Sequence, residues 1–140
     1  MEAAVLAWSD VHEGMFVEWE FTVDESQMRQ FAELTGDYAP LHLDAEFARS
    51  RGFAGPVVYG ALLCGQLSRL IGMHIPGRDG FFIGLTADFR RPVIVGETVA
   101  LRAEVIQVSE ATRAIKLKYT LRAGGKIAVS GTAEGVLRSA

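Results

Sequence analysis

The spacing of hydrophobic residues changes from helical to strand-like after residue 73, and that change is the strongest constraint on the fold of this chain. Residues 60–73 are apolar at helical intervals, with Leu63, Leu67 and Leu70 on one face. After them, apolar and polar side chains alternate with the period of two that is typical of strands. We expect four such strands, at residues 81–89, 98–108, 114–122 and 127–137.

The predicted helix has few polar positions on any side. Ala61, Leu62 and Cys64 extend its apolar surface well around the axis, so we expect the helix to be buried. A buried helix followed by long strands indicates an α+β fold, in which a curved antiparallel sheet wraps around the central helix. The strand over 114–122 has one polar face, as antiparallel sheets often do. Because an open sheet edge is a liability that a second copy can cover, we expect a homodimer.

The first half of the chain is predicted to hold a loop between two helices. After a short strand over 16–23, Asp24 starts an Asp-Glu-Ser-Gln sequence that is typical of a helix N-terminus. Gly36 predicts the end of that helix, and Asp44 predicts the cap of a second, short helix. We therefore expect the residues between them, 36–43, to form a loop.

Size and charge exclude several classes of function. With 140 residues we expect a single domain, residues 1–140, and a net charge of −3 gives no electrostatic reason to bind nucleic acid. The apolar stretches are too short and too interrupted to span a membrane, and the first residues lack the basic start of a signal peptide. Cys64 is the single cysteine, so no internal disulfide can form and the reducing cytoplasm is the expected compartment.

The predicted loop carries the residues best suited to acid/base chemistry. Asp37 and His42 are five residues apart in a stretch broken by a glycine and a proline. A loop can aim both side chains at one water molecule, and one group can then accept a proton while the other donates. Both residue types are also common on surface loops, so the spacing alone leaves a non-catalytic role open. A metal site with Asp44 is disfavoured because no second histidine lies nearby.

Several short segments form one ordered pattern. They are Thr-Gly-Asp-Tyr-Ala-Pro-Leu-His-Leu-Asp at 35–44, Phe53, Val-Tyr-Gly at 58–60, Phe-Arg-Arg-Pro-Val at 89–93 and Gly-Glu-Thr-Val at 96–99. In order and spacing they closely resemble the signature of the MaoC-like and (R)-specific enoyl-CoA hydratases. The resemblance extends over residues 11–137 and implies the hot-dog fold of that family, a curved antiparallel sheet around a central helix.

The resemblance also implies an activity. It predicts a hydro-lyase that reversibly hydrates a 2-enoyl thioester, carried on CoA or on an acyl-carrier protein, with no bound cofactor or metal. Asp37 and His42 would hold water against C3 of the enoyl group. The backbone N–H of Gly60, at the start of the central helix, would stabilise negative charge on the thioester oxygen. Ser68 matches a family serine near the catalytic pair that would orient the aspartate, although a helix serine can equally bond back to a carbonyl.

The pattern departs from the family at two positions and leaves two arginines to explain. The usual asparagine before the proline is Ala39 here, and the usual histidine before the helix glycine is Tyr59. Both substitutions are expected to reshape the substrate pocket without removing the acid/base pair. Arg90 and Arg91 are candidates for contacts with the phosphates of the carrier, because arginine suits such contacts. Before a proline turn they are as often simply solvated.

Two other functions remain open. Hot-dog domains also hydrolyse thioesters, in which case water attacks the carbonyl carbon and the acidic residue often lies on the central helix. The helix predicted over 60–73 contains no Asp or Glu, which argues against a thioesterase. A non-catalytic acyl-binding domain is the second alternative. The presence of both Asp37 and His42 argues against that interpretation, whereas Ala39 and Tyr59 keep it open.

Overall fold

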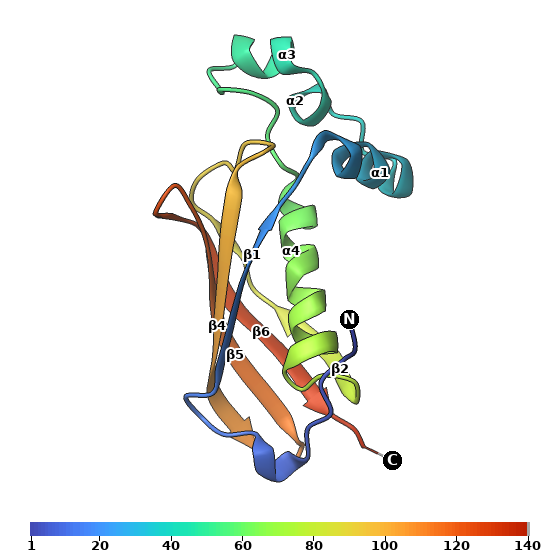
Figure 1. Cartoon of the computed structure of the whole chain (residues 1–140), viewed down its shortest axis with the longest axis vertical. Coiled ribbons are helices and arrows are strands. Elements are labelled where there is room, and N and C mark those ends of the chain that lie inside the picture. Colours follow the sequence, from blue (N-terminus) through green and yellow to red (C-terminus); the bar gives the residue numbers. More distant parts are fainter. Residues whose placement is uncertain (140) are drawn as a thin grey trace.

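The computed structural model describes residues 1–139 and contains one antiparallel sheet packed against one long helix (Figure 1). The strands are β1 (Phe16–Thr22), β2 (Gly80–Leu85), β3 (Asp88–Phe89), β4 (Thr98–Ser109), β5 (Ala114–Ala123) and β6 (Lys126–Leu137). Their order in the sheet is β1-β4-β5-β6-β2, and β3 also pairs with β6. The helices are α1 (Glu25–Thr35), α2 (Pro40–Leu43), α3 (Ala45–Ser50) and α4 (Gly60–Arg69).

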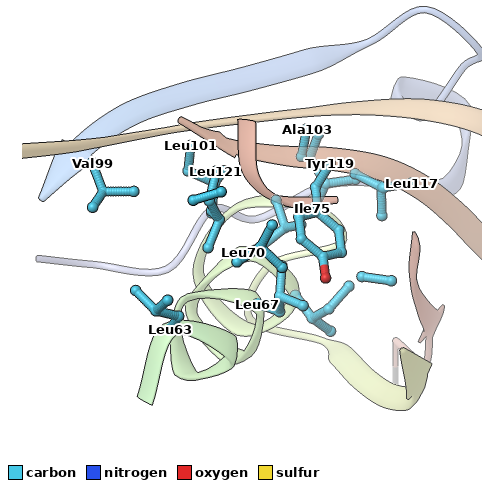
Figure 2. Packing of buried hydrophobic residues seen from close by; sticks show 14 of the residues in the cluster. Leu63, Leu67, Leu70, Ile75, Val99, Leu101, Ala103, Leu117, Tyr119 and Leu121 are labelled. Atoms are coloured by element: carbon cyan, nitrogen blue, oxygen red, sulfur yellow. The ribbon is translucent and has the colours of Figure 1, made fainter. Parts of the chain in front are cut away.

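The hydrophobic core lies between α4 and the sheet (Figure 2). Leu63, Leu67 and Leu70 of the helical segment meet inward-facing residues of the strands, among them Leu101 and Leu121. Burying each such side chain stabilises the fold by about 1.5–3 kcal/mol. The arrangement confirms the predicted α+β class, with an antiparallel sheet around a central helix.

Only one face of α4 is buried, in contrast to the expectation from its composition. Leu63 and Leu67 are buried, whereas Ala61, Gly65 and Ser68 are exposed. The sheet covers one side of the helix, and the small residues on the opposite side remain open to solvent in a single chain. The prediction of a helix buried on most sides was therefore wrong for the isolated chain.

The helical path also ends later than Gly72, where the sequence placed a plausible stop. Regular α-helix ends at Arg69 and continues as a π-helical turn over Leu70–His74, so that Gly72 lies inside that turn. The N–H of Ile75 donates to the carbonyl of Leu70 at 2.9 Å and closes the turn. This wider turn lets Leu70 and Ile75 both enter the core.

The strand predicted over 81–89 is divided into β2 and β3. Thr86 follows β2, and its N–H donates to the carbonyl of Thr132 at 2.8 Å. The Oγ1 atom of Thr86 accepts from the N–H of Thr132 at 2.9 Å, while its carbonyl accepts from the hydroxyl of Tyr119 at 2.8 Å. These side-chain bonds interrupt the regular ladder, so the chain bends before β3 begins.

Helices α1, α2 and α3 gather at one end of the molecule, beyond the first turn of α4 (Figure 1). The start of α1 is as predicted, because the Asp24 carboxylate accepts from the N–H of Gln27 and the Gln27 side chain accepts from the N–H of Asp24. Gly36 ends α1 in the left-handed conformation, with φ of 80°. The predicted loop after it contains the helical turn α2, which Pro40 begins with its preset φ.

Within the described residues, no helix has both the length and the apolar character that crossing a membrane would require.

Candidate active site

Asp37 follows the glycine that ends α1 and is fixed at its backbone. Its Oδ1 atom accepts from the N–H of Ala39 at 3.1 Å, which makes a local turn. Its carbonyl oxygen accepts from the hydroxyl of Tyr59 at 2.6 Å. Within residues 1–139, no residue bonds to the second carboxylate oxygen, Oδ2. The carboxylate is exposed, so Oδ2 is open to water or substrate.

His42 lies in α2, and its ring has a defined proton distribution. Its Nδ1 atom is 2.6 Å from the carbonyl oxygen of Val57. A carbonyl can only accept, so Nδ1 carries the hydrogen and the neutral ring leaves Nε2 unprotonated. No hydrogen bond to Nε2 is formed from the part of the chain that the structure describes. Nε2 is therefore the atom that can take a proton.

Tyr59 connects these two residues. Its side chain is buried, with 2% of its surface exposed. Its ring stacks against that of His42, with 4.0 Å between centroids and 28° between planes, and it also packs against Phe31 at 4.5 Å. Burial, and then the negative charge of Asp37, raise the pKa of Tyr59. The hydroxyl therefore stays protonated and continues to donate to the Asp37 carbonyl.

Gly60 begins α4, where the first N–H groups of a helix have no partner inside the helix. A side chain at this position would collide with Phe89, since a Cβ atom would lie 2.9 Å from Cε1 of that ring. The absence of a side chain at Gly60 therefore leaves room for an aromatic ring. Sequence reasoning missed Phe89 as a site residue, although the residue opens the Phe-Arg-Arg-Pro-Val segment.

Ser68 is not brought to the acid/base pair by any contact. It is exposed and lies eight residues after Gly60, about 12 Å further along the helix. Within the described residues it makes no side-chain hydrogen bond to Asp37. It lies on the open face of α4.

The two arginines after β3 lie apart from the pair. Nε of Arg90 donates to Oγ of Ser130 at 2.9 Å. Ser130 and the buried Val129 point to opposite faces of β6, so Arg90 lies on the sheet face away from α4. Arg91 is exposed, and its backbone N–H donates to the carbonyl of Ala128 at 3.2 Å.

Asp44 has a structural role. Its Oδ1 atom accepts from the N–H of Phe47 at 3.0 Å and caps α3, as predicted. No cluster of three or more His, Cys, Asp or Glu side chains suited to a metal ion occurs in residues 1–139.

Two grooves lie outside the acid/base pair. One of about 890 Å³ opens on the polar face of the sheet, between charged residues of β1, β4 and β5. The other, of about 440 Å³, lies between α1, β1 and α4, and Phe31 and Leu62 form part of its wall. Neither Asp37 nor His42 lines either groove. Asp37 is exposed and His42 is partly buried, so both can be reached from solvent outside these two grooves.

The arrangement suits proton transfer to and from a bound water. Within residues 1–139, Oδ2 of Asp37 and Nε2 of His42 make no hydrogen bond, while Oδ1 and the carbonyl of Asp37 and Nδ1 of His42 are each held by another group of the protein. The start of α4 follows Tyr59 directly and favours negative charge through its unpaired N–H groups and its dipole. A reaction that moves a proton and builds charge on an oxygen matches these features.

Comparison with known proteins finds a family whose model matches most of the chain: the model of the MaoC-like domain matches residues 11–125. The 3-hydroxybutyryl-CoA dehydratase of Methylorubrum extorquens is 30% identical over 132 residues, which are 94% of this chain and 84% of the relative. The (R)-specific enoyl-CoA hydratase of Aeromonas caviae is 36% identical over 109 residues, 77% of this chain and 81% of the relative. A solved (R)-hydratase from A. caviae involved in PHA biosynthesis has a TM-score of 0.88 and 32% identity, covering 91% of this chain and 98% of that one.

Proposed function

The chain belongs to the MaoC-like domain family, and we propose that it is a hydro-lyase that adds water to a 2-enoyl thioester and catalyses the reverse dehydration. The activities named for its relatives in M. extorquens and A. caviae support this assignment. One observation carries the proposal. Backbone groups hold one atom of each side chain, Oδ1 of Asp37 and Nδ1 of His42. Oδ2 and Nε2 have no partner within the described residues and are left for a water molecule.

In the hydration direction, the water lies between Oδ2 of Asp37 and Nε2 of His42. One of these atoms takes a proton as the water oxygen bonds to C3 of the substrate. The electrons of the C2–C3 double bond move toward the thioester, whose oxygen becomes negative. The carbonyl re-forms when C2 takes a proton from the acid/base pair, so that the elements of one water are added in total. General acid/base catalysis of this kind contributes about 10²–10⁴-fold in rate.

The backbone N–H of Gly60 is the proposed donor to the thioester oxygen. It lies in the first turn of α4, where the helix dipole also favours an anion. A donor of this kind typically contributes about 2.7–4 kcal/mol of transition-state stabilisation. The reaction as written needs no bound cofactor or metal, and the substrate is an acyl-CoA or an acyl-carrier thioester.

We propose that the enzyme is a homodimer formed through β2. This edge strand has no partner on its outer side within the described sheet. Its side chains Phe81, Ile83 and Leu85 are exposed large hydrophobics, with 61% of Phe81 accessible. Pairing β2 with its copy would satisfy the open ladder and bury this apolar edge. The second copy would also supply the surface that an enclosed acyl pocket requires.

Two further properties belong to the proposal. We place the enzyme in the cytoplasm, because its one cysteine, Cys64, makes no disulfide. We favour hydration over thioester hydrolysis because neither α4 nor the π-helical turn after it contains an Asp or Glu. In hot-dog thioesterases the acidic residue often lies on that helix.

The assay follows the absorbance of conjugated 2-enoyl-CoAs of several chain lengths and measures free thiol in the same reaction. Wild type is expected to remove the enoyl absorbance without releasing thiol. Asp37→Asn and His42→Ala are each expected to lose at least about a hundredfold in kcat. Thiol release by wild type would identify a thioesterase. Absence of any turnover by a folded protein would favour the acyl-binding domain.

A further inference from the structure

We propose that Tyr59 is a positioning residue that holds Asp37 and His42 in their working arrangement. The inference rests on the proposed function, since it concerns the same acid/base pair. The family pattern has histidine at this position, so the role assigned here belongs to the tyrosine of this chain. It follows from two contacts made by one buried side chain, one through its hydroxyl and one through its ring.

The hydroxyl contact ties the backbone of Asp37 to the start of α4. Oη of Tyr59 donates to the Asp37 carbonyl at 2.6 Å, across 22 positions of sequence. The other bonds of Asp37 are local, to Thr35 at 3.3 Å and to Ala39 at 3.1 Å. Within the described residues, the bond from the Tyr59 hydroxyl is thus the one hydrogen bond that joins Asp37 to a distant element. Without it, the turn at Asp37 can move relative to α4.

The ring contact fixes the plane of His42. The bond from Nδ1 to Val57 holds one edge of the imidazole, but the ring could still tilt about that bond. The face of Tyr59, at 4.0 Å, limits that tilt. Phe31 of α1 packs against Tyr59 at 4.5 Å and keeps the tyrosine ring itself in place. Three helices, α1, α2 and α4, are thereby joined at this side chain.

The hydroxyl is also a polar group beside a loop whose position 39 has an apolar side chain. The family pattern has asparagine at position 39, and here Ala39 offers only its backbone. Tyr59 brings a side-chain donor to this loop, because its hydroxyl donates to the Asp37 carbonyl at 2.6 Å.

The test compares Tyr59→Phe with Tyr119→Phe. Both tyrosines are buried, and each hydroxyl donates to a backbone carbonyl, that of Asp37 at 2.6 Å or that of Thr86 at 2.8 Å. Each substitution removes one equivalent hydrogen bond and keeps the ring. Tyr59→Phe is expected to lower kcat about tenfold with KM changed less than threefold. Tyr119→Phe is expected to lower the melting temperature about as much as Tyr59→Phe does. It is expected to leave kcat within twofold of wild type.

Two further readouts separate positioning from general stability. Amide exchange at Ala39 and His42 is expected to accelerate in Tyr59→Phe and not in Tyr119→Phe. In an Asp37→Asn background, the kcat penalty of Tyr59→Phe is expected to shrink to less than twofold, because the tyrosine acts through Asp37.

Unchanged exchange at Ala39 and His42 in Tyr59→Phe would overturn the inference, and so would equal kcat losses in the two Tyr→Phe variants. A wild type without hydratase activity would instead overturn the proposed function. In that case the exchange measurement would still decide whether Tyr59 holds the loop.

Discussion

Phe89 occupies the space that a side chain at position 60 would need, because a Cβ atom on Gly60 would lie 2.9 Å from Cε1 of the ring. Phe89 is the last residue of β3, so this contact joins the edge of the sheet to the first turn of α4. The Phe89 side chain is 56% exposed. It lies next to Gly60, whose backbone N–H is the proposed donor to the thioester oxygen. Phe89, 29 positions later in the chain, therefore limits the size of the residue at the start of α4.

Gly60→Ala is expected to reduce activity more than stability. The new methyl group would lie 2.9 Å from Cε1 of Phe89, so either that ring or the start of α4 must shift. The Phe89 ring is 56% exposed and can move aside at little cost, so the loss of stability is expected to be small. Displacement of the amide should lower kcat by at least about tenfold. Adding Phe89→Ala should restore part of the lost kcat. Steady-state kinetics of the single and double variants measure both effects. A wild-type kcat in Gly60→Ala would contradict the prediction.

Asp44→Asn is expected to keep both stability and activity, whereas Asp44→Ala is expected to lose about 1 kcal/mol of unfolding free energy. The Asp44 carboxylate accepts the N–H of Phe47, and an asparagine oxygen can accept the same bond. Asp24→Ala removes an equivalent cap at α1, far from His42 in sequence, and serves as the matched control. Denaturant titration gives the stabilities. A loss of activity in Asp44→Asn that added metal restores would favour a ligand role instead.

The elements that could be predicted from the sequence have local causes. The start of α1 depends on Asp24 and Gln27, which are three residues apart, and its end depends on the positive φ of Gly36. The same holds for the cap of α3 at Asp44. The candidate pair was identified for a similar reason, because Asp37 and His42 lie in one short segment.

The features that sequence reasoning missed have distant causes. The strand break at Thr86 depends on the hydroxyl of Tyr119, 33 positions away, and on Thr132, 46 positions away. The link between Tyr59 and Asp37 crosses 22 positions. No periodicity along a single strand or helix carries such information, because these contacts form only when the elements pack together. Ala61, Gly65 and Ser68 of α4 stayed exposed for the same reason, since composition does not indicate which face the sheet covers.

The stability of the fold is expected to fall as the pH drops below about 6.5. His74 stacks on Trp19 at 4.5 Å, and the guanidinium of Arg69 lies 4.4 Å from the same indole ring. Burial, and then the charge of Arg69, lower the pKa of His74 from its usual 6.5. Between the lowered pKa and 6.5 the unfolded chain binds more protons than the folded one, so stability present above pH 6.5 is lost as the pH falls through that interval.

His74→Phe should remove this pH dependence, because phenylalanine keeps the stack on Trp19 and does not titrate. The melting temperature should therefore fall less between pH 8 and pH 5 in the variant than in wild type. Substitution of the exposed His12 by asparagine is the control and should leave the profile of wild type unchanged. If wild type and His74→Phe show the same dependence of melting temperature on pH, His74 is not the cause of the loss of stability.

Phe81→Lys is expected to convert the proposed dimer into monomers, whereas Phe16→Lys is not. Both phenylalanines are exposed on edge strands of the same sheet, 61% on β2 and 49% on β1. Lysine on an edge strand opposes pairing with another strand, because its charge would have to be buried. Sedimentation velocity of the two variants therefore identifies which edge forms the interface.

If the second copy also closes the acyl pocket, Phe81→Lys should raise KM for long 2-enoyl-CoAs in parallel with dissociation. A dimer that survives Phe81→Lys and dissociates with Phe16→Lys would place the interface on β1, at the other edge of the sheet.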